Sequence, residues 1–236
     1  MMKSKIILIA LALTAVSCQK AEQNGSFSIS LKEGEVADIV TRSSVSDYAT
    51  IPSDGDFTLT INNGKTDVWS GLLSDWNSET KLKAGNYTAD VTFGDPEDEG
   101  YSKPYFAGSA EFMIFGGQNT DVVIPVTLGN CVVRIECTDA FMNYYPVSSF
   151  KVATGAGNEF DYTGGGLFID AYKFTVSGKV TSQGGNSYDL AEKTWNVKAA
   201  TCYTVKYDVV NAGGVTVTIT FSDELETVSL TEDLND

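Results

Sequence analysis

The chain has 236 residues, of which 42% are hydrophobic and 20% are charged, and its 31 acidic and 16 basic side chains give a net charge of −15 at pH 7. Such a surface repels phosphate backbones, which argues against a nucleic-acid partner. The sequence contains no histidine, so a Ser-His-Asp triad, a Cys-His pair and a histidine-ligated metal site are excluded.

The first 17 residues have the pattern of a lipoprotein signal peptide. Lys3 and Lys5 form a basic start, and residues 6–16 form an uncharged apolar stretch that is too short to cross a bilayer as a helix. The small residues before Cys18 match a lipobox, so we expect cleavage at this point and acylation of Cys18 by chains such as palmitate. The lipid would be the link to the membrane. An ordinary secretory signal cut nearby is the alternative, and it also exports the protein.

Apolar and polar residues alternate in a series of short segments, a period typical of half-buried β-strands. In chain order, these segments are residues 27–31, 57–61, 87–93, 122–128, 131–137, 203–209 and 215–221. The Asn-Gly pair at 63–64 predicts a tight hairpin turn. No segment shows a sustained helical period, so the sequence predicts an all-β fold of antiparallel sandwiches.

Two features refine this organisation. Pro125 removes a backbone donor inside a predicted strand, so we expect that strand to be an edge strand or to carry a bulge. A weak repeat relates residues 83–88 to 198–204 and indicates two tandem sandwiches, with a single bilayered domain as the alternative. The predicted boundaries are 1–17 for the signal peptide, 18–25 for anchor and linker, 26–130 for the first sandwich and 131–236 for the second.

Three cysteines remain if Cys18 carries lipid. Cys131 and Cys137 lie on one face of the same predicted strand, about 20 Å apart, so they cannot pair with each other within it. Either could pair with Cys202. The odd count and the apolar neighbours favour buried free thiols.

The remaining chemical motifs are weak. Ser78 with Lys81, and Ser148 with Lys151, fit Ser-x-x-Lys, but the other elements of penicillin-recognising enzymes are missing. The acidic cluster at 95–99 lacks the spacing of a calcium loop and is expected to be solvated. A glycoside hydrolase would need two facing carboxylates in a cleft, whereas the acids here fall in predicted turns and tails. We therefore expect no enzyme activity and no cofactor.

Aromatic side chains are the best remaining candidates for ligand contact. Tyr101 and Tyr105 flank Lys103 and Pro104 in a predicted loop, where they could form a platform for a sugar ring or a protein partner, and Trp76 is a further candidate. Packing in the core is the alternative for each ring. The wider set of candidates consists of Trp69, Trp76, Tyr101, Tyr105, Phe106, Tyr144, Tyr145 and Trp195.

The order of motifs from Gly25 to Cys131 resembles a family of uncharacterised lipoproteins (domains of unknown function) and fimbrillin-like adhesins of Bacteroidetes. After a lipobox ending in Ser-Cys, the chain shows Gly-Ser-Phe-Ser-Ile-Ser-Leu at 25–31, Thr-Arg at 41–42, Asp-Phe-Thr-Leu-Thr-Ile at 56–61, Leu-Lys-Ala-Gly-Asn-Tyr-Thr at 82–88, Pro-Tyr-Phe-Ala-Gly at 104–108 and Asn-Cys at 130–131. Beyond residue 141 only the general β character matches.

The resemblance implies two transthyretin-like or immunoglobulin-like sandwiches and lipid anchorage at the outer membrane, facing the cell surface. It also implies a non-catalytic role in cell adhesion or fimbria-like assembly. In polymerising fimbrillins an arginine-specific protease releases the first strand, and Arg42 occupies a comparable position; an ordinary surface arginine is the alternative. The second functional hypothesis is a glycan-binding accessory lipoprotein of a polysaccharide uptake system. Other surface proteins, fimbrial subunits or glycans are therefore the expected partners.

Overall fold

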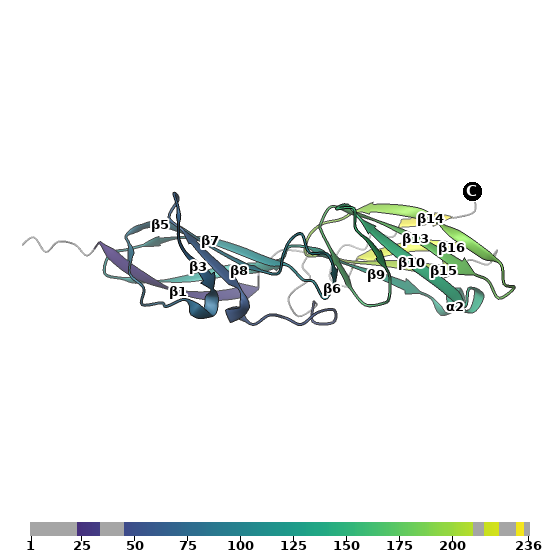
Figure 1. The fold of residues 1–236 in the computed structure, drawn as a ribbon, viewed down its shortest axis with the longest axis horizontal. Helices are drawn as coiled ribbons and strands as arrows, with labels where there is room; N and C mark the ends of the chain where they lie inside the picture. Colours follow the sequence, from purple (N-terminus) through teal and green to yellow (C-terminus); the bar gives the residue numbers. More distant parts are fainter. Residues whose placement is uncertain (1–22, 34–44, 210–214, 222–229, 234–236) are drawn as a thin grey trace, which may run out of the picture.

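The computed structural model describes residues 23–33, 45–209, 215–221 and 230–233. In this part of the chain the regular structure is almost entirely β-strand. The strands form two sandwiches placed end to end, and the short helix α2 (Asp139–Tyr144) lies at the free end of the second one (Figure 1). The predicted all-β fold with tandem sandwiches is therefore confirmed.

The first sandwich is one sheet that bends over on itself, in the order β3-β2-β5-β7-β8-β1-β4. β7 and β8 pair only where Phe106–Gly108 meets Val126–Leu128, so the two strands diverge over the rest of their length. The parts of the sheet on either side then face each other as two layers. The bounds are β1 Asn24–Glu33, β2 Thr58–Asn62, β3 Asp67–Leu72, β4 Leu82–Lys83, β5 Gly85–Phe93, β7 Phe106–Ile114 and β8 Asn119–Leu128. Two 3-10 turns, Asp54–Asp56 and Leu73–Asp75, flank β2 and β3.

Strict alternation builds the core between these layers. In β2 the side chains of Leu59 and Ile61 are fully buried, and in β5 those of Ala89 and Val91 are. The intervening residues face outward, as period two requires. Each strand therefore buries the face that the sequence pattern predicts.

The second sandwich consists of two separate sheets. One has the order β11-β10-β13-β14 and the other β17-β16-β15-β9-β12-β6. Their inner faces share an aromatic core in which the Tyr207 ring lies 4.8 Å from Phe150 and 5.8 Å from Phe141. The bounds are β6 Gly100–Tyr101, β9 Cys131–Cys137, β10 Val147–Thr154, β11 Glu159–Asp161, β12 Leu167–Ile169, β13 Lys173–Thr181, β14 Ser187–Asn196, β15 Cys202–Val209, β16 Val215–Phe221 and β17 Leu230–Asp233.

Local signals in the sequence explain the β2–β3 hairpin but only part of β8. Gly64 adopts a φ of +82°, as the Asn-Gly turn predicts, and its N–H donates to the Asn62 side chain at 2.6 Å. The expectation that the strand with Pro125 is an edge strand or carries a bulge is wrong, because β8 lies between β7 and β1 and pairs with both without a register shift. The pairing of β8 with β7 nevertheless stops at Val126, so the missing donor of Pro125 falls where β7 has already separated.

One loop of the first sandwich supplies a strand to the second. The connection between β5 and β7 runs into the second sandwich, where β6 pairs with β12 through Gly100 and Tyr101. This strand adds to the edge of the six-stranded sheet and fixes the two halves to each other. Figure 1 shows β6 at the junction.

Buried side chains close the same junction. The Asn130 side chain is buried; it donates to the Lys103 carbonyl at 2.9 Å and accepts from the Tyr105 N–H at 3.3 Å. Tyr48 packs between the halves, 5.4 Å from the Arg134 guanidinium, and burial raises the pKa of Tyr48 to about 12. The junction is thus packed and hydrogen-bonded rather than a free linker.

Replacing Asn130 by alanine should lower the free energy of unfolding by roughly 1–3 kcal/mol, because the part-buried Tyr105 N–H and Lys103 carbonyl lose their partner. Urea denaturation followed by tryptophan fluorescence measures the change. Asn186→Ala, at an exposed asparagine in the β13–β14 turn, is the matched control and should change stability by less than about 0.5 kcal/mol. Equal effects of the two variants would contradict the role given to Asn130.

Candidate functional site

The first strand, β1, is held on one side only for most of its length. It pairs in parallel with β8 from Ser26 to Glu33. On its other side, only Asn24 and Gly25 pair, with the two-residue strand β4. From Ser26 onward β1 is therefore an edge strand whose outer hydrogen-bonding groups have no strand beside them among the described residues.

The inner face of β1 covers the core of the first sandwich. Phe27 is fully buried, and its ring lies 4.7 Å from Trp76 and 4.6 Å from Phe112. Ile29 and Leu31 follow on the same face and pack on the same cluster. Removal of β1 would uncover these rings and leave a hydrophobic groove beside β8.

Trp76 is the floor of this groove rather than an exposed platform. It is half-buried, packs against Phe27 and Trp69, and its Nε1 has no hydrogen-bond partner among the described residues. This placement fits the core-packing alternative considered for each aromatic residue. Displacement of β1 would remove Phe27 from the ring and expose more of it.

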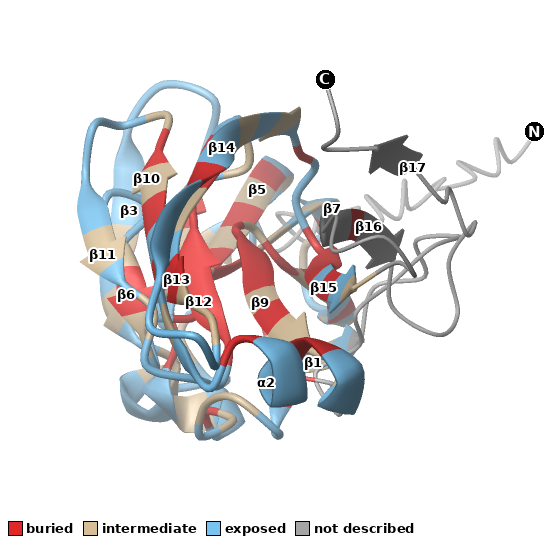
Figure 2. Ribbon diagram, turned by 90° about the vertical axis from the view of Figure 1, so that its right-hand side faces the viewer, coloured by how far each residue is buried: buried red, intermediate tan, exposed pale blue. Residues whose placement is uncertain are grey.

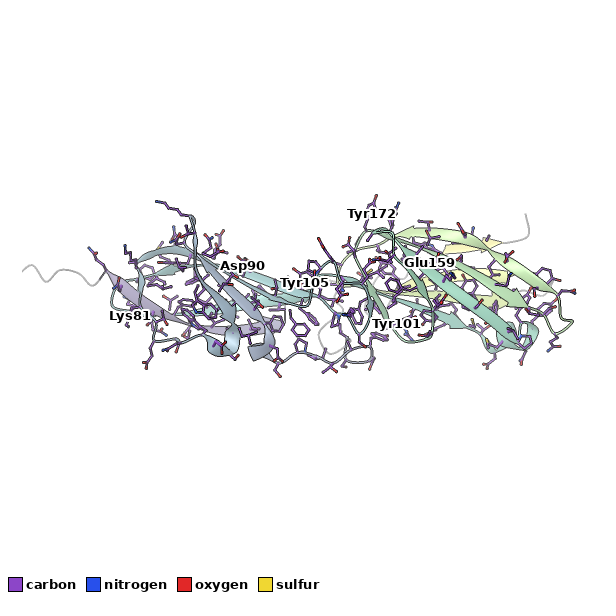
Figure 3. The ribbon with its side chains drawn as sticks, in the orientation of Figure 1. Lys81, Asp90, Tyr101, Tyr105, Glu159 and Tyr172 are labelled. Carbon is purple, nitrogen blue, oxygen red and sulfur yellow. The ribbon has the colours of Figure 1, made fainter. Side chains whose placement is uncertain are left out.

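Tyr101 and Tyr105 both lie at the junction between the sandwiches (Figure 3). The Tyr101 hydroxyl donates to the Asp161 carbonyl at 3.1 Å and accepts from the Thr163 N–H at 2.9 Å. The Tyr105 ring lies so close to Gly129 that a Cβ there would be 2.5 Å from it. Both rings are half-buried and have structural contacts.

Two predicted site residues, Cys18 and Arg42, lie outside the described residues. The sequence has only one other arginine, Arg134. Arg134 belongs to β9, pairs in register with Thr204 of β15 and forms an ion pair with Glu136 at 2.8 Å. A protease that cuts after arginine would therefore find Arg134 inside a sheet.

The free end of the second sandwich carries a cluster of tyrosines that the sequence analysis located only in part. The Tyr145 ring lies 4.8 Å from Tyr144 and 6.4 Å from Tyr188, and the two outer rings are 46% and 50% exposed. The Gln183 N–H donates to the Tyr144 carbonyl at 3.1 Å, which ties the β13–β14 turn to α2. We call Tyr144, Tyr145 and Tyr188 the tyrosine end; Figure 2 views the molecule from this side.

The tyrosine end is uncharged, although the chain as a whole is acidic. Residues 142–149 and 181–188, the two segments that carry its three rings, contain no Asp, Glu, Lys or Arg. They do contain amide and hydroxyl side chains beside the rings. Tyr188 could have been found from this lack of charge but not from alternation, because β14 is mostly exposed.

The acidic cluster at 95–99 is not entirely a solvated loop, contrary to expectation. Glu99 reaches into the second sandwich, where its carboxylate accepts from Thr154 Oγ1 at 2.6 Å, from Asn158 Nδ2 at 2.8 Å and from the Asp170 N–H at 2.8 Å. The rest of the cluster remains exposed, with Asp98 paired to Lys103. Glu99 is therefore a junction residue.

The described residues contain no group of three or more Cys, Asp or Glu side chains placed to hold a metal. Cys131, Cys137 and Cys202 are free, and burial raises the pKa of all three thiols, that of Cys137 to about 11. These thiols are poor nucleophiles at neutral pH.

The structure gives neither Ser-x-x-Lys motif a catalytic setting. Ser148 and Lys151 are three residues apart on β10 and so face opposite sides of the sheet, while Ser78 and Lys81 lie outside any helix. A polar pocket of about 640 Å³ lies beside the β2–β3 turn and contains one carboxylate, Glu111. No helix of the described residues is long and apolar enough to span a membrane.

The geometry defines a class of protein: an elongated all-β molecule of two tandem sandwiches whose distinctive features are an edge strand and an aromatic end. Residues 23–236 match the model of the family described as Domain of unknown function (DUF4493), and the chain belongs to this family. None of the curated proteins matches it.

One solved structure with a TM-score above 0.5 shows this fold, and others resemble the chain more weakly, all at low sequence identity. A fimbrial assembly protein from Parabacteroides distasonis is 7% identical with a TM-score of 0.52, over 89% of this chain and 99% of that one. A candidate cell adhesion protein from Bacteroides thetaiotaomicron is 15% identical with a TM-score of 0.44, over 78% and 91% of the two chains. Another from Bacteroides uniformis is 12% identical with a TM-score of 0.47, over 86% and 98%. The resemblance noted in the sequence is thus confirmed.

Replacing Glu99 by alanine should destabilise the junction by roughly 1–3 kcal/mol, since three hydrogen bonds to a half-buried carboxylate are lost. Thermal unfolding and limited proteolysis within residues 94–105 report the change. Glu97→Ala, an exposed acid of the same loop, is the control and should leave both unchanged. Identical behaviour of the two variants would contradict the role of Glu99 in stabilising the junction.

Proposed function

We propose that this chain is a lipid-anchored, non-catalytic cell-surface protein that acts in adhesion or as a fimbria-like assembly component of the outer membrane. The observation that carries the proposal is β1, an edge strand whose inner face covers the core of the first sandwich. The names of the solved relatives, which include a fimbrial assembly protein and candidate cell adhesion proteins, support the same class.

Assembly by strand exchange follows from the position of Arg42, nine residues after the end of β1. A cut at Arg42 separates β1 from the rest of the chain, and the ladder to β8, the short pairing with β4 and the contacts of Phe27, Ile29 and Leu31 then hold it. A strand from another subunit can replace β1, because the groove supplies both backbone hydrogen bonds and apolar sites. Before this cut, acylation of Cys18 attaches the chain to the membrane.

Digestion of the mature protein with an Arg-specific protease should give one cut, at Arg42, because the other arginine lies inside a sheet. Native mass spectrometry should then show loss of the β1 peptide and a ladder of oligomers. Tryptophan emission should shift as Trp76 loses Phe27 as a cover.

The matched control is Arg42→Gln, which should resist the protease and stay monomeric. Intact mass of the membrane-extracted protein checks the anchor, since acyl chains on Cys18 add to the mass of the chain that starts there. A protein that is cut at Arg42 and remains monomeric would sink the assembly hypothesis and leave adhesion as the role. A chain without lipid would overturn the anchorage.

The tyrosine end favours a second candidate function, a glycan-binding accessory lipoprotein. Exposed rings beside amides and hydroxyls suit neutral sugars, which present C–H faces and hydroxyl edges. Trp76, Tyr101 and Tyr105 remain candidates for this role, but their half-buried positions make the tyrosine end the better site.

A Tyr144→Ala/Tyr188→Ala variant should weaken binding to a neutral polysaccharide on a glycan array by about tenfold or more, because two stacking rings are lost. Tyr172→Ala is the control, since Tyr172 is even more exposed but lies outside the tyrosine end. If the double variant binds the glycan as well as the wild type does, the tyrosine end is not the binding surface. If the wild type binds no glycan, the glycan-binding function is excluded.

A further inference from the structure

The end of the first sandwich where β1 begins is built from three segments. The Ala84 N–H donates to the Gln23 carbonyl at 2.6 Å, and the Gly117 N–H donates to the Asn24 carbonyl at 2.9 Å. The start of β1, the β4–β5 turn and the β7–β8 turn therefore form one surface. We name residues 23–25, 80–86 and 113–119 the basal end.

The basal end exposes two large apolar side chains. Met113 is 45% exposed and Phe115 is 51% exposed. Met113 precedes the buried Ile114, so alternation along β7 points it outward. Phe115 lies in the turn after β7, where the Gln118 N–H donates to its carbonyl at 3.3 Å. The two rank among the most exposed apolar residues of the described chain.

The charge of the basal end is opposite to that of the whole protein. Its three segments contain Lys81 and Lys83 and no acid, although the chain has a net charge of −15. The nearest acids in the sequence, Glu22, Glu79, Glu111 and Asp121, lie just outside the segments. Figure 3 shows Lys81 at the end of the molecule that is farthest from the second sandwich.

The length of the chain before Gln23 brings this surface close to the lipid. Four residues lie between Cys18 and Gln23, and the five Cα-to-Cα steps from one to the other span at most about 18 Å when fully extended. If Cys18 carries acyl chains in the bilayer, the basal end lies within that distance of the headgroups. A surface with exposed Phe and Met beside lysines and no acids suits an anionic bilayer interface.

We infer that the basal end rests on the lipid bilayer, with Phe115 and Met113 at the headgroup boundary and Lys81 and Lys83 facing anionic headgroups. This inference rests on the proposed acylation of Cys18. The lipid attaches the chain, and the basal end orients it. The two sandwiches then extend away from the membrane, because β1 begins at one end of the molecule and the tyrosine end lies at the other (Figure 1).

The test uses the acylated protein in nanodiscs that contain phosphatidylethanolamine and an anionic phospholipid. Amide hydrogen exchange at residues 113–119 should be at least about tenfold slower in discs than in the protein released from its lipid, because burial of the apolar side chains restricts opening of the turn. Met113→Ser/Phe115→Ser should lose this protection while remaining in the discs. Discs of neutral lipid should reduce the protection of residues 113–119, by up to roughly fivefold for each lysine.

The matched control is Met142→Ser/Tyr172→Ser, which removes a similarly exposed pair from the second sandwich and should keep the protection. Wild-type protein that is held in the discs but exchanges at 113–119 as it does in water would overturn the inference. Protection that arises only when other envelope proteins are added would assign the basal end to a protein partner and also overturn it.

Failure of the anchor is a separate result. If the intact mass shows no acyl chain on Cys18, the chain that begins at Cys18 is coupled through this thiol to a maleimide lipid, and the same exchange measurement is made. Cys131 and Cys202 are buried, and Cys137 has a raised pKa, so coupling at neutral pH selects Cys18. Protection at 113–119 in that sample supports the basal end as a lipid-contacting surface, and its absence overturns the inference.

Discussion

Burial of one face of β1 is the constraint on which the first sandwich depends. Phe27 lies between Trp76 and Phe112, and Ile29 and Leu31 extend the same contact. Without these side chains, the layer of β8 would not cover the layer of β2, β5 and β7. Backbone pairing with β8 and burial of one face in the core hold β1 by noncovalent contacts. Another strand could make the same contacts, so covalent attachment to the chain is what keeps β1 in this place. The half-buried position of Trp76 follows from this arrangement.

The second constraint is the junction. β6 pairs with β12, Glu99 accepts three hydrogen bonds from the second sandwich, and the buried Asn130 binds the loop that leads back to β7. Each of these contacts comes from a segment that sequence alone would assign to a loop. Together they replace a flexible linker by a packed interface. A force applied at the tyrosine end is therefore transmitted to the first sandwich.

The alternation of apolar residues predicted most of the long strands, because period two reports burial of one face directly. Residues 27–31 fall in β1, 58–61 in β2 and 87–93 in β5, and the expected side chains of Phe27, Leu59 and Val91 are fully buried. The order of the strands was not predictable in this way, since it depends on contacts between distant residues. Pro125 lies in an inner strand because β7 separates from β8 before reaching it. Tyr101 was chosen as exposed, yet its hydroxyl bonds to residues about 60 positions away. Tyr188 was missed because its strand is mostly exposed and only the fold brings it beside Tyr145.

The parallel pairing of β1 with β8 has a mechanical consequence. The anchor proposed here would pull on the start of β1, whereas a load at the tyrosine end reaches the far end of β8 through β9. Because the two strands run in the same direction, these forces would slide them past each other along their length. All hydrogen bonds from Ser26 to Glu33 would then carry the load together, rather than breaking one after another from an end. The strand that is simplest to exchange after cleavage is thus, in the intact chain, placed to resist a pull between the membrane and a bound target.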